Sequence, residues 1–306
     1  MDQSIHVAVG VILDQQNRVL IARRNADAEQ GDPWEFPGGK LEAGESVKAA
    51  LQRELREELD IHIDPAACYP FKCIHHTYKE YRVLLDVWRI THFRGVPRGL
   101  QGQPLTWCPV AELTAREFPA ANAAIIKLLQ LPPVMTITGP CTGREVFLDR
   151  LKRLLARGGK LIQFRQPDLP LPEYLEWAAA GTAMCRQSGA RLILNTDPAA
   201  LRRVRDADLH VTSARLRALA ERPVDSGCLF SASCHSRDEL IHAEQIGADL
   251  VLLSPVNATT SHPEAVPLGW ETFQALAASV SLPVYALGGI RVADLPRATG
   301  AGAFGV

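Results

Sequence analysis

A regular alternation of short apolar segments and helical segments through the second half of the chain is the feature that most constrains its fold. Eight apolar segments have the length of strands, at residues 134–138, 160–165, 191–195, 208–211, 229–233, 250–254, 283–287 and 303–306. Helical segments separate them, and such βα repeats build parallel sheets. Eight repeats favour closure into a (β/α)8 TIM barrel over a doubly wound open sheet. The chain stops at the eighth strand, so we expect a barrel that lacks its last outer helix.

Two consecutive prolines divide the chain into halves. Pro132 and Pro133 cannot continue a helix, and a length of 306 residues is typical of two domains. We therefore predict one domain over residues 1–131 and a second over residues 132–306. The first half mixes strands and helices in an α+β order: a strand over 5–13, its hairpin partner over 18–23, a polar loop over 25–45, a helix over 46–59, strands over 71–76, 82–90 and 105–108, and a helix over 119–131.

Charge and composition narrow the classes of partner. Lys plus Arg is 33 and Asp plus Glu is 34, a net charge of −1, whereas proteins that bind long nucleic acid usually carry a basic surplus. A small phosphorylated ligand needs only a few local charges or a metal. No apolar run approaches the roughly 20 residues of a membrane span, and the first residues lack the positive region of a signal peptide. The seven cysteines form no CxxC pair, so we expect reduced thiols and a cytoplasmic protein. The oligomeric state stays open.

The helix expected over 46–59 carries carboxylates on its apolar side. Its apolar stripe consists of Val47, Ala50, Leu51 and Leu55. On a helical wheel Glu54 and Glu58 fall inside the arc of this stripe, and Glu57 borders it. Like charges at i and i+4 destabilise an isolated helix by roughly 0.2–0.5 kcal/mol, and a hard cation such as Mg²⁺ or Mn²⁺ removes that repulsion. An acidic helix end that is solvated, or paired with Arg53 and Arg56, explains the triplet alone equally well.

The wider spacing resembles a known signature. Gly-x5-Glu-x7-Arg-Glu-Leu-x-Glu-Glu, from Gly39 to Glu58, resembles the Nudix hydrolases. Segments 8–10, 22–24, 34–40 and 118–122 resemble the MutT branch of that family in the same order, so that the resemblance covers residues 4–131. It implies a Nudix α/β/α sandwich and a Mg²⁺-dependent enzyme, with Mn²⁺ as a second suitable ion. The implied reaction converts 8-oxo-dGTP to 8-oxo-dGMP and pyrophosphate, which keeps oxidised nucleotides out of replicating DNA and prevents mutation.

The same resemblance assigns roles to individual residues. The metal would be held by Glu54, Glu57, Glu58 and the Gly38 carbonyl, with Glu54 also a candidate base for the attacking water. Glu45 and Arg53 would brace the loop onto the helix as an ion pair. Substrate would meet Arg24 at phosphate or sugar, Phe36 in the base pocket and Asn122 at the purine edge, with Glu35, Pro37 and Gly38 beside them. By itself Asn122 is more typical of a helix start, and Phe36 of a core.

Two positions depart from the MutT pattern. Asp60 stands where the signature has a Gly that ends the helix in a left-handed conformation, which Asp adopts at some cost. Gln101 stands where MutT has a further metal-associated Glu. The second departure is expected to weaken one metal site without abolishing catalysis.

The second half places polar residues where its strands end, which is where barrels carry their chemistry. These residues are Gln163, Arg165, Asn195, Asp197, His210, His235, residues 259–261, Gly288 and Gly289. A set of segments in the same order resembles thiamine phosphate synthases and their relative TenI, a thiazole tautomerase: residues 163–165, Asn195, and residues 233–236, 247–249, 254–256 and 286–290. The resemblance implies a site for a thiazole or thiamine phosphate at Arg165, Asn195, His235, Gly288 and Gly289.

The synthase interpretation is weakened by three departures. Pro167 replaces a Lys, Thr196 replaces an Asp, and residues 212–214 lack a metal-binding Asp. We therefore do not expect thiamine phosphate synthesis, and TenI-like chemistry suits the sequence better. The leading prediction for the whole chain is 8-oxo-dGTP diphosphatase. The alternatives are a Nudix pyrophosphohydrolase of thiamine metabolism, and a barrel that is a non-catalytic ligand-binding or scaffolding module.

Overall fold

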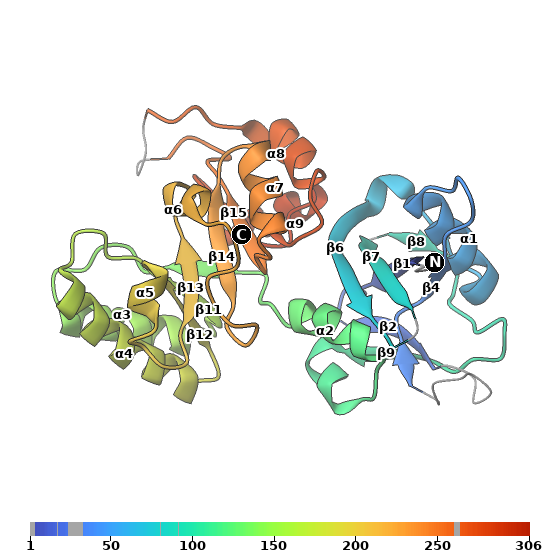
Figure 1. Cartoon of the computed structure of the whole chain (residues 1–306), viewed down its shortest axis with the longest axis horizontal. Helices are drawn as coiled ribbons and strands as arrows, with labels where there is room; N and C mark the ends of the chain where they lie inside the picture. Colours follow the sequence, from blue (N-terminus) through green and yellow to red (C-terminus); the bar gives the residue numbers. More distant parts are fainter. Residues whose placement is uncertain (1–3, 17, 24–32, 80, 91, 260–263) are drawn as a thin grey trace. The chain divides into compact units, whose positions relative to one another are not determined.

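The computed structural model describes residues 4–16, 18–23, 33–79, 81–90, 92–259 and 264–306. The chain forms two compact units, Met1–Leu131 and Pro132–Val306, and each is described by itself (Figure 1). Arg24, one of the expected substrate contacts, lies outside the described residues. Within the described ranges, no helix combines the length and the apolar character that a membrane crossing requires.

Two small sheets form the frame of the first unit. The larger has the order β4-β1-β7-β6, from strands β1 (Ser4–Ile12), β4 (Gly38–Lys40), β6 (Cys68–Thr77) and β7 (Arg82–Ile90). The second has the order β3-β2-β9, from β2 (Arg18–Arg23), β3 (Trp34–Glu35) and β9 (Leu105–Pro109). A two-stranded pair joins β5 (His62–Ile63) to β8 (Phe93–Arg94). Strand β1 is central because it pairs in parallel with β7 and antiparallel with β4.

Helix α1 (Val47–Leu59) packs on β1 and β4, which Figure 1 shows beside it. The Ser46 side chain caps its first turn by accepting a hydrogen bond from the Ala49 backbone. Four of its apolar side chains are buried, those of Ala50, Leu51, Leu55 and Leu59. The expected helix is therefore confirmed, and its apolar face determines which of its carboxylates turn toward the sheet.

Three expectations for the first half need correction. Strands β1 and β2 are not a hairpin, because both edges of β1 are taken by β4 and β7, and only one bridge joins Leu13 to Val19. The expected loop over 25–45 contains the short strands β3 and β4. The helix expected over 119–131 begins as a 3₁₀ turn (Ala120–Asn122) and continues as α2 (Ala123–Leu129).

The second unit contains a parallel sheet in strictly sequential order. Its strands are β10 (Met135–Ile137), β11 (Leu161–Phe164), β12 (Arg191–Asn195), β13 (Asp208–Val211), β14 (Phe230–Cys234), β15 (Leu250–Leu253) and β16 (Val284–Ala286). Its helices are α3 (Arg144–Ala156), α4 (Leu171–Gln187), α5 (Pro198–Leu201), α6 (Ser213–Ala218), α7 (Arg237–Gln245), α8 (Gly269–Ala277) and α9 (Leu295–Gly300). Figure 1 shows these helices on the outside of the strands. The fold is that of a TIM barrel, as expected.

The eighth expected strand is shorter than the sequence indicates. The Ala303 backbone still bonds to the end of α9, so only the last three residues are extended, with one bridge from Gly305 to Tyr285. Those residues nevertheless join the two edges of the sheet. Phe304 donates to the Val284 carbonyl at 2.7 Å, and Val306 accepts from the Met135 backbone at 2.8 Å. Backbone hydrogen bonds therefore close the ring from β16 to β10.

Candidate functional site

Helix α1 presents two glutamates toward the sheet and one toward solvent. The side chain of Glu54 is 16% exposed, whereas that of Glu57 is 60% exposed. Glu58, one turn beyond Glu54, is half-buried. The apolar face of the helix holds Glu54 and Glu58 at the protein interior, where their charges are less screened than at an open surface.

A glycine pair in β4 makes room for these carboxylates. A Cβ atom on Gly39 would lie 2.1 Å from Cδ of Glu54, so a larger residue there would displace the Glu54 carboxylate. Gly38 has φ +145°, and its missing Cβ would lie 2.1 Å from the Ala8 carbonyl oxygen. The Gly10 backbone donates to the Pro37 carbonyl at 2.8 Å and fixes the segment before β4 on β1. The two glycines therefore let a strand backbone lie directly against the carboxylate of Glu54.

Electrostatic repulsion is concentrated at Glu58. Burial first, and then the charges of Glu54, Glu35 and Glu57, raise the pKa of its carboxyl to about 7, against a hydrogen bond from the Gly38 backbone that lowers it. The dependence on Glu35 shows that the segment 34–36 approaches the helix. Such a cluster of carboxylates favours either a shared proton or a bound cation.

Arg53 ties the glutamate helix to the preceding loop. It donates to both oxygens of Glu45, from Nε at 3.0 Å and from Nη2 at 2.8 Å, so the expected ion pair between Glu45 and Arg53 is present. A third bond runs from Nη1 to Oε1 of Glu54 at 2.8 Å, and a fourth from Nη2 to the Lys40 carbonyl. The guanidinium holds the pKa of Glu45 below its usual value, through hydrogen bonds first and charge second. One side chain therefore orients the loop, β4 and the Glu54 carboxylate together.

The donor set suits a hard divalent cation, although its side chains are not gathered around one point. In the described part of the chain, no three acidic, histidine or cysteine side chains are arranged to hold a metal. Arg53 draws Glu54 to itself and lies 3.8 Å from the Glu57 carboxylate. The fit rests on chemistry: carboxylate oxygens of Glu54, Glu57 and Glu58, with mutual repulsion at Glu58, beside a backbone kept clear by glycine.

The expected base-pocket residues come from two segments that the fold brings together. Phe36 is buried and stacks on Phe118, with ring centroids 5.5 Å apart. Asn122 is only 7% exposed, and although α2 starts there, its side chain makes no capping hydrogen bond. Asn122 therefore lies at the helix start, but its side chain does not cap the helix. Phe36 is flanked by Glu35, the last residue of β3, and by Pro37, the residue before β4.

The two departures from the MutT pattern lie at the same end of α1. Asp60 has φ 57° and ψ 35°, so the helix does end in the left-handed conformation. The Leu100 backbone donates to the Glu58 carbonyl and the Arg98 backbone to the Leu59 carbonyl, each at 2.9 Å. Gln101 is therefore in a loop that packs on the last turn of the helix. Another residue of this loop, Gln103, bonds to the same turn and was not among the expected site residues.

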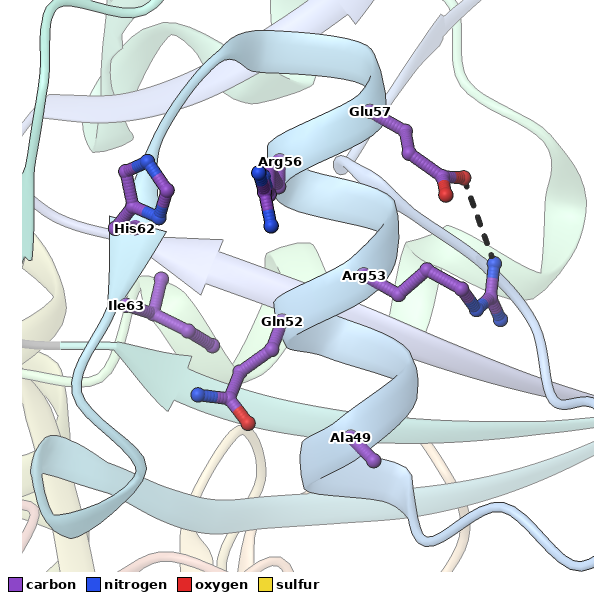
Figure 2. Close-up of a pocket in the computed structure, with 7 residues that line it drawn as sticks. All are labelled: Ala49, Gln52, Arg53, Arg56, Glu57, His62 and Ile63. Atoms are coloured by element: carbon purple, nitrogen blue, oxygen red, sulfur yellow. Dashed lines mark ion pairs between the residues drawn. The ribbon is translucent and has the colours of Figure 1, made fainter.

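A groove in the first unit runs along α1, and neither Glu54 nor Glu58 is among the residues that line it (Figure 2). Its volume is about 630 Å³, and it is lined by Ala49, Gln52, Arg53, Arg56, Glu57, His62 and Ile63. Figure 2 shows Gln52, Arg56 and His62 on one side of the helix and the ion pair of Arg53 with Glu57 on the other. None of the expected base-pocket residues lines it. The candidate site is therefore identified by its chemistry and not by the size of this groove.

In the second unit, the expected ligand residues follow the carboxyl ends of the strands, on one rim of the sheet. Arg165 follows β11, Asn195 ends β12 and His235 follows β14. Nδ1 of His235 lies 2.7 Å from the Ser254 carbonyl oxygen. Since a carbonyl oxygen only accepts, Nδ1 is the donor of this hydrogen bond, and Nε2 is the ring nitrogen left to meet a ligand.

A buried glutamate that was not expected holds the backbone at His235. Glu239 accepts from the His235 backbone at 2.7 Å, from Oγ of Ser213 at 2.6 Å and from Nη1 of Arg217 at 3.0 Å. The signal available in the sequence was the helix start Ser236-x-x-Glu239, which is typical of a capping box. Here the glutamate bonds to the residue before the cap and links the loops after β13 and β14.

Neutral polar groups fill the interior of the same barrel. His210 is 1% exposed, and its ring nitrogens lie 2.9 Å from the hydroxyls of Ser231 and Ser233. Burial, with a smaller contribution from the charge of Arg165, lowers its pKa to about 3. Gln163 is equally buried, and its Nε2 has no hydrogen-bond partner among the described residues. An unpaired buried amide is a candidate ligand contact that the sequence identified only as polar.

The glycine pair after β16 has a structural reason of its own. Gly288 and Gly289 have φ 91° and 63°, and a Cβ on Gly288 would lie 2.6 Å from Cα of Pro255. A Cβ on Gly289 would lie 2.5 Å from the Ala258 carbonyl oxygen. Close packing on the loop after β15 therefore requires glycine at both positions.

Comparison with known proteins matches the two units to two families. A family model described as a NUDIX domain matches residues 8–128, and one described as thiamine monophosphate synthase matches residues 134–306. The 8-oxo-dGTP diphosphatase of Escherichia coli (strain K12) is 36% identical over 128 residues, which cover 42% of this chain and 98% of that protein. The CTP pyrophosphohydrolase of the same strain is 36% identical over 118 residues, covering 38% and 84%. The putative thiamine-phosphate synthase 2 of Aquifex aeolicus (strain VF5) is 31% identical over 178 residues, covering 58% and 96%.

Proposed function

The chain belongs to the Nudix family through its first unit and to the thiamine monophosphate synthase family through its second, and from this premise we propose that the first unit is a Mg²⁺-dependent pyrophosphohydrolase of oxidised purine nucleoside triphosphates. The proposed reaction takes 8-oxo-dGTP to 8-oxo-dGMP and pyrophosphate. It would remove a mutagenic precursor before DNA synthesis.

The observation that carries this proposal is the placement of Glu54 and Glu58 against the glycine pair of β4. Two carboxylates are held half-buried on one side of a helix, and burial together with their mutual repulsion raises the pKa of Glu58 to about 7. A merely solvated acidic helix end would leave these side chains exposed, as Glu57 is. Clustering that is unfavourable in the free protein supports binding of a cation.

Glu54, Glu57, Glu58 and the Gly38 carbonyl are the groups proposed to hold Mg²⁺. When bound, the ion supplies neutralisation of phosphate charge and lowers the pKa of a water. Glu54 is proposed to accept the proton of the attacking water. Arg53 engages its Oε1 at 2.8 Å, which leaves Oε2 for that proton and fixes the plane of the carboxylate.

Selection of the base is assigned to Phe36 and Asn122. The Phe36 ring, backed by Phe118, offers an apolar wall to a purine. The Asn122 amide provides a donor and an acceptor, as reading one purine edge requires, and no helix cap occupies it. Arg24 is proposed to meet phosphate or sugar. A purine preference matters because the two Escherichia coli relatives act, by their names, on 8-oxo-dGTP and on CTP.

A substrate panel with Mg²⁺ tests this function. We expect the highest kcat/KM for 8-oxo-dGTP among 8-oxo-dGTP, dGTP, ATP, CTP and thiamine diphosphate, with monophosphate and pyrophosphate as products by ³¹P NMR. A higher value for CTP would overturn the purine assignment. A higher value for thiamine diphosphate would favour the alternative of a Nudix enzyme in thiamine metabolism.

The second unit is proposed to bind a thiazole phosphate without making thiamine phosphate. Support comes from the unpaired Gln163 amide, from Arg165, Asn195 and the Nε2 of His235 on one rim, and from the sequence departures at 167, 196 and 212–214. Gly288 and Gly289 are proposed to bind the phosphate through their backbone N–H groups.

Calorimetric titration of the full chain with a thiazole phosphate should show binding that Arg165→Ala weakens. If the bound ligand is chemically converted, the unit has a TenI-like activity. If the ligand is recovered unchanged, its role is binding alone. Appreciable synthase turnover would overturn the proposal for this unit.

A further inference from the structure

One loop residue holds the last turn of α1, the turn that carries Glu58. The side chain of Gln103 donates from Nε2 to the Glu58 carbonyl at 3.0 Å and accepts from the Gln101 backbone at 2.9 Å. The first partner only accepts and the second only donates, so a single orientation of the amide satisfies both. Gln103 therefore connects the loop and the helix through one fixed group.

The loop around Gln103 is shaped for this contact. Gly102 has φ +79° and donates to the Gly99 carbonyl at 3.1 Å, which closes a tight turn. A Cβ on Gly99 would lie 2.0 Å from the Gln103 carbonyl oxygen, so the backbone can fold back on itself only at glycine. With the bonds from Arg98 and Leu100, the turn provides three hydrogen bonds to the last two carbonyls of α1.

Helix ends fray because their last carbonyls have no partner within the helix. Glu58 is in that frayable turn, and its carboxylate accepts a hydrogen bond from the Gly38 backbone. A carboxylate that must stay near Glu54 needs the turn beneath it to be fixed. We propose that Gln103 is a positioning residue that fixes Glu58 for the hydrolysis reaction, an inference that rests on the function proposed above.

Two variants test the two hydrogen bonds of the Gln103 side chain separately. Gln103→Met keeps the shape of the side chain and removes both hydrogen bonds, whereas Gln103→Glu keeps an acceptor for the Gln101 backbone and removes the donor to Glu58. Gln52→Met is the matched control, because Gln52 is exposed on the outer side of the same helix (Figure 2). Each protein is measured as the full chain, by amide hydrogen exchange and by steady-state kinetics with 8-oxo-dGTP and Mg²⁺.

We expect Gln103→Met to speed exchange at the amides of Gln101, Leu100 and Asp60 by about five- to tenfold, as loss of typical hydrogen bonds implies. Its kcat should fall by about three- to tenfold with KM changed less than about twofold, because binding groups are untouched. Gln103→Glu should speed exchange at Asp60 but keep Gln101 protected, and its kcat should fall similarly. Gln52→Met should match the wild type.

Unchanged exchange at Asp60 in both variants would overturn the proposal, since the turn would then be fixed without Gln103. A fall in kcat without faster exchange would also overturn it and would assign Gln103 a direct role in the reaction. If the wild-type chain shows no hydrolysis, the proposed function fails, and the exchange results still decide whether Gln103 holds the turn. If Gln103→Met does not fold, Gln103→Glu carries the same test at the helix end.

Discussion

The candidate site of the first unit comes from two turns of α1 and a glycine strand just before it, whereas the candidate site of the barrel collects residues from Arg165 to Gly289 at the ends of successive strands. In the first unit the important groups are charged and are held by an arginine. In the barrel, the buried polar group His210 is neutral and bonds to neighbouring serines, while Arg165, Asn195 and His235 lie half-buried or exposed at the rim. The first arrangement leaves a fixed spacing in the sequence, and the second leaves only scattered polar residues.

The two arrangements also differ in how they use burial. Burial raises the pKa of Glu58 to about 7 and leaves a group that titrates near neutrality. In the barrel, burial lowers the pKa of His210 to about 3 and keeps it neutral at every ordinary pH. The difference suggests that the helix is built to change its charge on binding a cation, while the barrel interior is built to stay neutral.

The largest effect is expected from neutralising the helix carboxylates. Glu54→Gln and Glu58→Gln should each lower kcat with 8-oxo-dGTP by about a hundredfold or more, as loss of a metal-holding or base group does. Folding should persist because no apolar core residue changes. Glu112→Gln, at an exposed glutamate of the same unit, is the control. Near-normal turnover in the folded variants would show that these carboxylates of α1 are not part of the site. The contrast with the barrel would then not hold.

A smaller effect is expected at the base pocket. Asn122→Ala should lower the ratio of kcat/KM for 8-oxo-dGTP over dGTP by about 5- to 150-fold, equal to roughly 1–3 kcal/mol of selectivity from a paired amide. The half-saturating Mg²⁺ concentration should not change. Gln130→Ala, an exposed amide at the end of α2, serves as the control. An unchanged ratio would assign base reading to another residue.

The sequence alone predicted features that depend on neighbouring residues better than features that depend on distant ones. The extent of α1, the ion pair of Glu45 with Arg53 and the left-handed end at Asp60 were predictable, because each depends on residues close together in the chain. The closed barrel was predictable from its repeat. The bounds of its last strand were not, because the end of α9 and the closing bonds compete for the same few residues.

Contacts between segments far apart in the chain could not be predicted from the sequence. The hairpin of β1 with β2 was wrong because the edges of β1 pair with strands that lie far along the chain. Gln103 and Glu239 were missed as site residues because their partners are backbone groups, which carry no residue-specific pattern. That the Asn122 side chain does not cap α2 was likewise visible only in the structure.

Acidification should lower the unfolding free energy of the barrel through a buried histidine, which the described residues of the first unit do not include. The pKa of His210 is about 3 in the folded state against an ordinary value of 6.5. Between these values only the unfolded chain binds the proton, so the stability from this group is complete above pH 6.5 and is lost as the pH falls toward 3. From pH 7 to pH 5 the barrel should lose about 2 kcal/mol through this group. Urea unfolding of wild type and His210→Gln at both pH values measures it, and equal losses in the two proteins would contradict a buried neutral histidine.

The smallest effect concerns the residue that departs from the Nudix signature at the end of α1. Asp60 has φ 57°, a conformation that a non-glycine residue adopts at a cost, so Asp60→Gly should raise the unfolding free energy of the first unit by up to about 1 kcal/mol. Asp60→Ala is the matched variant and should lower it, since alanine has neither the freedom of glycine nor a side chain that bonds to the nearby backbone. Urea unfolding of the first unit measures both changes. A destabilised glycine variant would show that the Asp60 carboxylate stabilises the folded state by more than the left-handed backbone destabilises it. This end of the helix would then depend, like the barrel interior, on contacts that its local sequence does not reveal.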